Sequence, residues 1–156
     1  MRLHVVAVGR LKLEYARLGC AEYAARIQHS FPLEIHEIRD VPRKGNDVAR
    51  ARADEARGLR AALPPGAAYV AMDERGAEWD SVAFATWLGQ QRDASLPALA
   101  FVIGGPDGLD PELRASARRV WSLGRLTLPH ELARLVLLEQ LYRAGSILAG
   151  LPYHRE

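Results

Sequence analysis

Runs of apolar residues that alternate with polar ones, or that continue without interruption, predict β-strands along this chain. LHVVAVG is short and β-branched, and ALAFVIGG is continuously apolar, so both are typical of strands buried on two faces. LEIHEI alternates, which places Leu33, Ile35 and, after a slip, Ile38 on the buried side of a strand. The predicted strands are residues 3–9, 33–38, 67–73, 98–105 and 120–129, the last of which passes into a loop.

Apolar residues at helical spacing predict helices between these strands. Asp47, Asp80 and Asp110 each precede such a segment and are expected to cap it, because an Asp side chain accepts hydrogen bonds from the first backbone N–H groups. In the first helix, Tyr15 and Leu18 begin an apolar stripe that is expected to face the core. The predicted helices are residues 14–29, 47–63, 80–93, 110–119 and 130–150.

The regular alternation of strand and helix predicts an α/β fold with a mostly parallel sheet flanked by helices. No repeat, low-complexity tract or linker divides the chain, so residues 1–156 are expected to form a single domain. The last predicted helix is apolar on more than one face, and such a helix must be buried nearly all round. A partner subunit is the simplest cover for its second face, and a two-fold dimer is the commonest form.

Composition places the chain among ordinary globular proteins, with 49% hydrophobic and 26% charged residues. No stretch approaches the ~20 apolar residues of a membrane span, and the apolar run near the N-terminus is too short for a secretory signal. A single cysteine, Cys20, excludes an internal disulfide and makes a cytoplasmic location the default. Cys20 itself is expected to be a small apolar filler of the core.

The net charge of +2 is unevenly distributed. Residues 1–60 contain 12 basic and 8 acidic side chains, and many of the basic ones fall between residues 39 and 60. A solvated helix face explains such a segment as readily as a polyanion site does. Because acids are interleaved, the charge pattern alone does not predict nucleic-acid binding.

Two loops and the tail are candidates for chemistry. VIGGPDG, with Gly104 and Gly105 at the end of a predicted central strand, suits close approach of the backbone to a ligand, although a tight turn is equally consistent with it. LGRLTL at 123–128 could offer backbone groups and an apolar floor to a flat heteroaromatic ring, but a loop that buries its leucines is the commoner use. His130 then begins the last helix, where a capping role is favoured over catalysis.

The terminal PYHRE combines a phenol, an imidazole and a guanidinium. His154 titrates near neutrality and can take or give a proton. Tyr153 can stack or form hydrogen bonds, and Arg155 can pair with a phosphate. An unstructured tail is the usual alternative, but Tyr153 and the rigid Pro152 favour a tail held close to the fold. The five His residues lack close spacing and no Cys pair exists, so no metal site is predicted.

VIGGPDG, WSLGRLTLPHELARLVLLEQLYRA and the terminal PYHRE together resemble the RlmH-type SPOUT methyltransferases, which modify a pseudouridine in large-subunit ribosomal RNA. LHVVAVGRLK and MDERGAEWDS fit the same family, so the resemblance runs from end to end. It implies a SPOUT-like fold with a C-terminal trefoil knot, an exception to the rule that chains are un-knotted. It also implies a homodimer.

The resemblance implies S-adenosylmethionine as the methyl donor, with no metal required. The implied cofactor contacts are Met72, Gly104, Gly105, Leu123, Gly124, Arg125, Leu126, Thr127 and Leu128. The implied reaction is methylation of N3 of a pseudouridine in 23S ribosomal RNA. In our hypothesis His154 is the base or proton relay and Tyr153 positions the target base. Arg143 and Arg155 bind phosphate or an imide oxygen.

A +2 chain without a separate RNA-binding domain has little electrostatic grip on RNA, so the assembled ribosome is the expected substrate. Within this interpretation residues 39–60, including Arg43 and Lys44, are the expected phosphate-contacting patch. Two alternatives remain open: a non-catalytic ribosome-associated module, and a knotted methyltransferase acting on transfer RNA. The intact motifs disfavour the first, and the lack of an extra RNA-binding domain disfavours the second.

Overall fold

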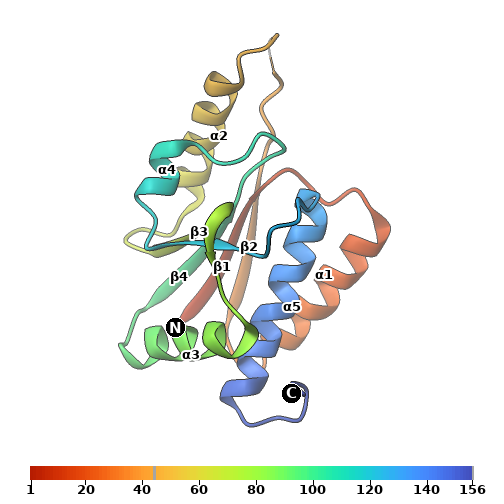
Figure 1. Ribbon diagram of the computed structural model, residues 1–156, viewed down its shortest axis with the longest axis vertical. Helices are drawn as coiled ribbons and strands as arrows, with labels where there is room; N and C mark the ends of the chain where they lie inside the picture. The colour runs from red at the N-terminus through yellow and green to blue at the C-terminus, as the bar shows by residue number, and fades with distance from the viewer. Residues whose placement is uncertain (44, 156) are drawn as a thin grey trace.

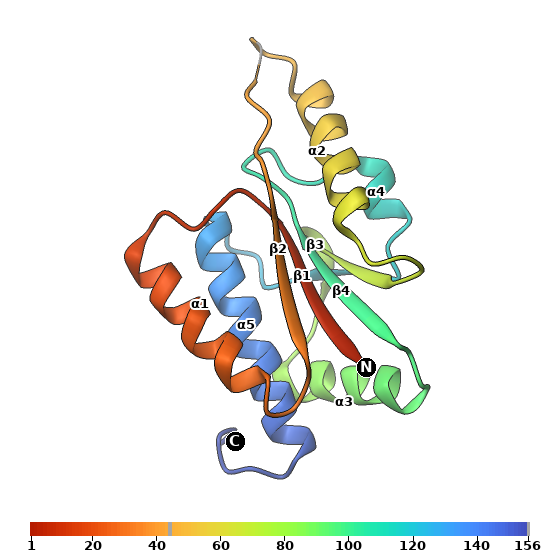
Figure 2. The ribbon, with the colours of Figure 1, turned by 180° about the vertical axis from the view of Figure 1, so that it is seen from behind.

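Residues 1–43 and 45–155, which the computed structural model describes, form a five-stranded parallel sheet with helices on both faces (Figures 1 and 2). The strand order is β2-β1-β4-β3-β5. The strands are β1 (Arg2–Val8), β2 (Leu33–Ile38), β3 (Ala68–Glu78), β4 (Ala98–Ile103) and β5 (Arg119–Ser122). The helices are α1 (Glu14–Ile27), α2 (Val48–Ala62), α3 (Ser81–Asp93), α4 (Pro111–Ala115) and α5 (His130–Leu148). The predicted α/β class is confirmed, and the trefoil knot stays a prediction.

The sheet separates two apolar cores, which explains the continuous apolar runs of the central strands. On β1, Leu3 and Val5 are fully buried, with Val5 packed in the core shared with α1, α3 and α5. Val6 and Val8 face the opposite core, which α2 and α4 cover. Figure 2 shows α1 and α5 on one side of the sheet and α2 and α4 on the other.

The helix starts follow the predicted caps. The side chains of Asp47, Asp80 and Asp110 accept hydrogen bonds from backbone N–H groups in the first turns of α2, α3 and α4. The start of α5 differs from the prediction, because Pro129 occupies the cap position and no side chain caps this helix. His130 is therefore the first helical residue rather than the cap.

Two sequence-based assignments of the buried face were wrong. On α1 the buried positions include Ala16, Cys20 and Ile27, whereas Leu18 is 65% exposed and Tyr15 is also exposed. On β2, Leu33 is buried as predicted, but Ile35 is exposed. β2 is an edge strand, and the neighbouring elements cover it only in part. Ile38 needs no slip, since it packs in the opposite core.

Helix α5 is covered on its second apolar face by helices of its own chain. It packs between α1 and α3. A Cβ on Gly145 would lie only 2.9 Å from Ser30 Cβ, so α5 and the segment after α1 approach too closely there for a side chain at position 145. The breadth of the apolar surface of α5 therefore has an explanation within one chain, and the homodimer stays a prediction. Across the described ranges, no helix has the length and apolar character needed to cross a membrane.

Two polar side chains of α5 fix the β1–α1 connection. Glu131 accepts hydrogen bonds from the backbone N–H groups of Lys12 (2.5 Å) and Leu13 (3.0 Å), which immediately precede α1. Arg134 is buried and donates to the Gly9 carbonyl oxygen at 2.9 Å. These contacts hold the first turns of α5 at the carboxyl end of β1.

Candidate functional site

A cavity of about 650 Å³ lies at the carboxyl ends of β3, β4 and β5. This is where ligands bind in open α/β sheets, because the loops that follow parallel strands meet at the same edge. Its walls come from an irregular part of β3, from the loops after β4 and β5, and from the start of α5. The main lining segments are residues 72–75, 103–108, 121–124 and 126–130, with Arg52 and Ala133.

The loop after β4 approaches its neighbours too closely to carry side chains at two positions. A Cβ on Gly104 would lie 3.0 Å from the carbonyl group of Gly108. A Cβ on Gly105 would lie 3.0 Å from the carboxylate Oε1 of Glu55. The Gly108 N–H donates to the Gly105 oxygen at 3.0 Å and closes the turn. The loop therefore presents bare backbone to the cavity.

The buried side chain of Glu55, on α2, packs against this loop at Gly105. Burial raises the pKa of Glu55, and hydrogen bonds from the backbone N–H groups of Val41 and Gly105 oppose that rise. One side chain thus connects the segment before α2, α2 itself and the glycine loop.

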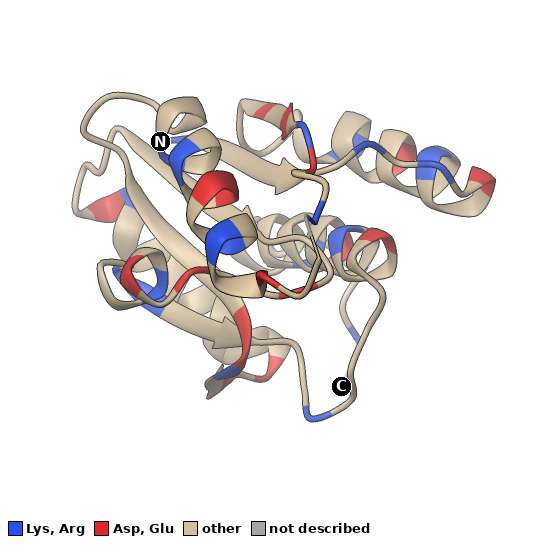
Figure 3. Ribbon diagram, turned by 90° about the horizontal axis from the view of Figure 1, so that it is seen from above, with Lys and Arg blue, Asp and Glu red and all other residues tan. Residues whose placement is uncertain are grey.

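Two arginines bind the same loop at Asp107. Arg52 Nε donates to the carbonyl oxygen of Asp107 at 2.6 Å, and Arg43 Nε donates to the Asp107 carboxylate at 2.7 Å. Part of the basic 39–60 segment is therefore occupied in positioning the loop. Basic and acidic residues are interleaved over the ribbon (Figure 3). Lys44, which belongs to the predicted phosphate-contacting patch, lies outside the described residues.

The 123–128 loop begins with a turn that Ser122 holds. Ser122 is buried, and its hydroxyl donates to the Gly124 oxygen at 2.8 Å and accepts from the Gly124 N–H at 3.2 Å. Gly124 has φ +131°, which side chains rarely allow. Leu126 is 81% exposed and lines the cavity, so the loop offers apolar surface rather than burying all of its leucines.

Strand β3 forms the third wall. Its pairing with β5 shifts register between Met72 and Ala77. Residues 72–75, at the start of this irregular segment, line the cavity. Burial opposes ionisation of Asp73, but hydrogen bonds from the Arg75 backbone and from the Arg75 and Arg114 side chains hold the pKa of Asp73 below its ordinary value. A stable carboxylate therefore lies in the wall.

The structure brings together almost all of the residues predicted to bind the cofactor. Met72, Gly104, Gly105, Leu123, Gly124, Leu126, Thr127 and Leu128 line the cavity. Arg125 is exposed and is not part of the lining. The prediction missed Arg52, Asp73, Asp107 and Trp121. Only Asp73 carries a usable signal, as the first acidic residue after an apolar strand.

The C-terminal tail packs against its own chain instead of extending into solvent. The Tyr153 hydroxyl donates to Glu139 Oε1 at 3.0 Å and lies 3.3 Å from the Tyr23 hydroxyl. The Arg143 guanidinium lies over the Tyr153 ring, 4.8 Å from its centre, and Arg143 Nη1 lies 3.3 Å from His154 Nδ1. Arg155 is exposed. Tyr153, His154 and Arg143 thus form one cluster, as their predicted joint role requires.

Charge states in this cluster follow from its contacts. Burial, together with hydrogen bonds to Tyr23 and Glu139, raises the pKa of Tyr153, so this phenol remains protonated at neutral pH and cannot act as a base. The hydrogen bond to Glu139 raises the pKa of Arg143. Because a guanidinium only donates, His154 Nδ1 accepts, and the neutral ring carries its hydrogen on Nε2.

The tail cluster and the cavity lie at opposite ends of α5. His130 lines the cavity at the first residue of this helix, whereas the tail follows its last turn. Glu139 and Arg143, which contact the tail, lie nine and thirteen residues beyond His130, about 14 Å and 20 Å along the helix at 1.5 Å per residue. Figure 1 shows α5 running from the loop edge of the sheet to the tail at the far end. Within one chain, the two groups of predicted site residues are therefore not brought together.

A parallel sheet with a glycine loop and an apolar loop meeting at its carboxyl edge defines an α/β protein with a ligand site in the loops. The family described as "Predicted SPOUT methyltransferase" matches residues 1–154. The chain belongs to the SPOUT methyltransferase family and is a methyltransferase.

Curated relatives agree with this assignment, and a solved structure shares the fold. The chain is 48% identical over 161 residues to the Ribosomal RNA large subunit methyltransferase H of Rhodopseudomonas palustris (strain HaA2), covering 99% of both proteins. It is 45% identical to the protein of the same name from Verminephrobacter eiseniae (strain EF01-2), covering 100% of both. The crystal structure of a probable methyltransferase from Bordetella pertussis Tohama I shares the fold, with a TM-score of 0.55 at 17% identity, covering 92% of this chain and 95% of that one.

Proposed function

We propose that this protein transfers a methyl group from S-adenosylmethionine to N3 of a pseudouridine in 23S ribosomal RNA, acting as a homodimer on assembled ribosomes in the cytoplasm. One observation carries the proposal: two of the motif stretches that resemble the family, the glycine loop and the 123–128 loop, form walls of a single cavity. The close relatives named Ribosomal RNA large subunit methyltransferase H support ribosomal RNA as the substrate.

The residues of the cavity fit the proposed cofactor. Leu126 offers exposed apolar surface, and the glycine loop offers backbone groups without side chains. Trp121 Nε1 is a buried donor that has no hydrogen-bond partner among the described residues, and Trp121 lines the cavity. When bound, S-adenosylmethionine supplies a methyl group on a positively charged sulfur. The residues that would hold it are Met72, Gly104, Gly105, Leu123, Gly124, Leu126, Thr127 and Leu128.

We propose that each cavity is completed by the tail of a partner subunit. A chain's own tail is bound to Glu139 and Arg143, about 14 Å and 20 Å along α5 from His130 at the cavity. The exposed apolar side chains Leu13, Tyr15 and Leu18, at the start of α1, support a surface for a second copy. They lie beside the first turn of α5, since Glu131 binds the backbone of Leu13. A second copy of the chain bound at this surface would bring residues of the partner subunit close to the cavity.

In this proposal the tail acts on the imide of the target base. N3 carries a proton at neutral pH and becomes a nucleophile only when that proton leaves. The Nε2–H of His154 donates to an imide oxygen and stabilises the resulting anion while the proton passes to water, and Arg143 and Arg155 add positive charge. Tyr153, which stays protonated, positions the base by stacking or hydrogen bonding. In the alternative role, as base or relay, His154 itself takes up the N3 proton.

The ribosome supplies most of the recognition surface in this proposal. The basic 39–60 segment contributes phosphate contacts, but Arg43 and Arg52 are already bound to Asp107, which leaves the chain a limited electrostatic grip on free RNA. We therefore expect assembled ribosomes to be far better substrates than naked RNA.

Mass spectrometry of ribosomal RNA from cells with and without the gene tests the function. We expect one methylated pseudouridine nucleoside to disappear with the gene and to return when purified protein and S-adenosylmethionine are added to the mutant ribosomes. Fragmentation of this nucleoside identifies the methylated nitrogen. An unchanged nucleoside profile would contradict the proposal, and efficient methylation of a short naked stem-loop would contradict the ribosome as the substrate.

A further inference from the structure

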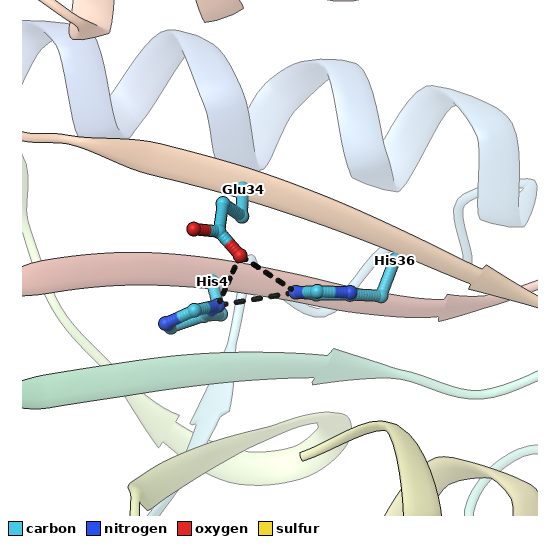
Figure 4. A group of neighbouring side chains, drawn as sticks. All are labelled: His4, Glu34 and His36. Carbon is cyan, nitrogen blue, oxygen red and sulfur yellow. Dashed lines mark hydrogen bonds and ion pairs between the residues drawn. The ribbon is translucent and has the colours of Figure 1, made fainter. Parts of the chain in front are cut away.

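A group of three side chains outside the cavity converges on the face of the sheet that carries α2 and α4. His4 lies on β1, and Glu34 and His36 lie two residues apart on β2, so that they share one face. The register pairs His4 with Glu34. Figure 4 shows the two imidazole rings and the carboxylate pointing toward one another from the two strands.

Three atoms of this group form a small triangle. His4 Nδ1 lies 3.1 Å from His36 Nε2, and the Glu34 Oε2 atom lies 3.8 Å from the first and 3.6 Å from the second. In the plane of a triangle with these sides, the point equidistant from the three atoms is about 2.0 Å from each. An ion about 0.7 Å out of this plane, toward a fourth ligand, would lie about 2.2 Å from each atom, close to zinc–imidazole and zinc–carboxylate bond lengths. We propose that His4, Glu34 and His36 bind Zn²⁺, with the fourth position of a tetrahedral site left to water.

The donor set selects the kind of metal. Two imidazole nitrogens with one carboxylate oxygen suit Zn²⁺, whereas Mg²⁺ and Ca²⁺ prefer oxygen ligands throughout. The three ligand atoms therefore match zinc in type.

The surroundings hold the donors in place. Arg2 Nη1 donates to the other carboxylate oxygen of Glu34 at 2.8 Å, which leaves Oε2 facing the two rings. Such outer contacts orient the ligands of metal sites in general. His4 is only 4% exposed, whereas Glu34 and His36 are partly exposed, so an ion can enter from solvent. Arg2 adds one positive charge nearby, which weakens cation binding without blocking the site.

Hydrogen bonding alone does not account for the arrangement. The two rings can share one hydrogen bond at 3.1 Å. Glu34 Oε2 lies beyond hydrogen-bond distance from both nitrogens, at 3.6 and 3.8 Å, yet it faces both of them. A bound metal ion would be coordinated by both imidazole nitrogens and by the Glu34 oxygen at the same time.

The position of the group indicates a structural role. β2 is an edge strand, and an ion shared by His4, Glu34 and His36 would cross-link it to β1. His4 lies near the amino end of β1, whereas the cavity lies at the carboxyl ends of β3, β4 and β5. We therefore expect zinc to stabilise the sheet without taking part in methyl transfer.

Sequence spacing could not reveal this site. Thirty residues and a helix separate His4 from Glu34, and only the parallel pairing of β1 with β2 brings them together. The sequence-based expectation of no metal rested on the absence of closely spaced ligands.

Zinc titration of the tag-free, chelator-treated full chain tests the proposal. We expect about one Zn²⁺ per chain by calorimetry and elemental analysis, and a higher melting temperature in the presence of zinc. His36→Ala and Glu34→Gln should each weaken binding at least tenfold and remove the thermal shift. His29→Ala is the matched control, because His29 is an exposed histidine outside the group, and it should bind zinc as the wild type does.

Each result decides the proposal. Absence of zinc binding by the wild type, or equal binding by the wild type and His36→Ala, would overturn it. If His36→Ala does not fold, as circular dichroism would show, Glu34→Gln alone provides the test, because its side chain keeps its size and is partly exposed. Loss of zinc binding in His29→Ala would mean that the ion binds elsewhere.

Discussion

The carboxylate of Glu55 fills the space that a side chain at position 105 would need, with Oε1 3.0 Å from the place of a Cβ on Gly105. A residue of α2 and a residue of the glycine loop, 50 positions apart in sequence, therefore pack tightly against each other. Glycine at 105 and a buried acid at 55 form a single structural unit.

Substitution Gly105→Ala is expected to weaken binding of S-adenosylmethionine roughly tenfold or more, which corresponds to about 1.4 kcal/mol. The added methyl group must displace either the Glu55 carboxylate or the loop itself. Calorimetry of cofactor binding checks this, with Ala94→Gly at the end of α3, away from the cavity, as a substitution of similar size. Unchanged affinity in Gly105→Ala would show that the loop does not touch the cofactor.

Glu55→Gln is expected to change how stability depends on pH. Burial raises the pKa of Glu55 above its ordinary value near 4.5, so between these two values the folded protein holds a proton that the unfolded chain has released. The free energy of unfolding of the wild type should therefore fall as pH rises through this window. Urea unfolding at several pH values should show this fall to be absent from Glu55→Gln, and an identical slope in both proteins would refute the assignment.

A pair of substitutions separates the two roles considered for His154. Glutamine retains an N–H donor but cannot take up a proton, whereas alanine does neither. If His154 acts as a donor, His154→Gln should keep much of the activity that His154→Ala loses, measured as methyl transfer to ribosomes lacking the modification. If it acts as base or relay, both variants should lose activity to the same extent. Full activity in His154→Ala with unchanged cofactor affinity would remove both roles.

Deletion of residues 153–156 is expected to abolish methyl transfer and to leave the fold, the dimer and cofactor affinity intact. Mixing this truncated chain with a Gly105→Ala chain, at a concentration of S-adenosylmethionine that leaves the weakened cavity largely empty, should restore up to about a quarter of the activity after subunit exchange. One cavity in each mixed dimer is then unaltered and receives an intact tail. Each parent protein alone serves as the control. Absence of recovery in a mixture shown to contain mixed dimers would indicate that the tail acts within its own chain.

Arg43 is a poor probe of RNA binding, because a charge reversal there would place two carboxylates together at Asp107 and disturb the loop. Arg50, on the exposed surface of α2, is a cleaner choice. Arg50→Glu should lower kcat/KM on ribosomes several-fold without changing affinity for S-adenosylmethionine. A shift in cofactor affinity instead would contradict a role in phosphate contact.

Local patterns allowed much of the fold to be predicted. The Asp47, Asp80 and Asp110 caps and the strand–helix alternation depend on neighbours in sequence, and they were confirmed. The exposure of Ile35 was not predictable, because it depends on which strand forms the edge of the sheet. The loop residues of the cavity followed from a resemblance in sequence.

Contacts between segments that are distant in sequence could not be predicted either, because they also depend on how the elements are arranged in the fold. Arg52 and Asp107 meet only because α2 packs beside the loop after β4. The distance between the tail and the cavity is likewise a property of the assembled chain, since it depends on the direction of α5 across the sheet.

Helix α5 sets both the spacing and the angle between the cavity and the C-terminal tail. One residue inserted between Glu139 and the end of α5 would turn the tail by about 100° and advance it by about 1.5 Å, so that Tyr153 would leave Tyr23 and Glu139. An insertion of seven residues would nearly restore the angle but lengthen the helix by about 10 Å. The length of α5 is therefore expected to tolerate almost no variation, in contrast to the surface loops at the opposite edge of the sheet.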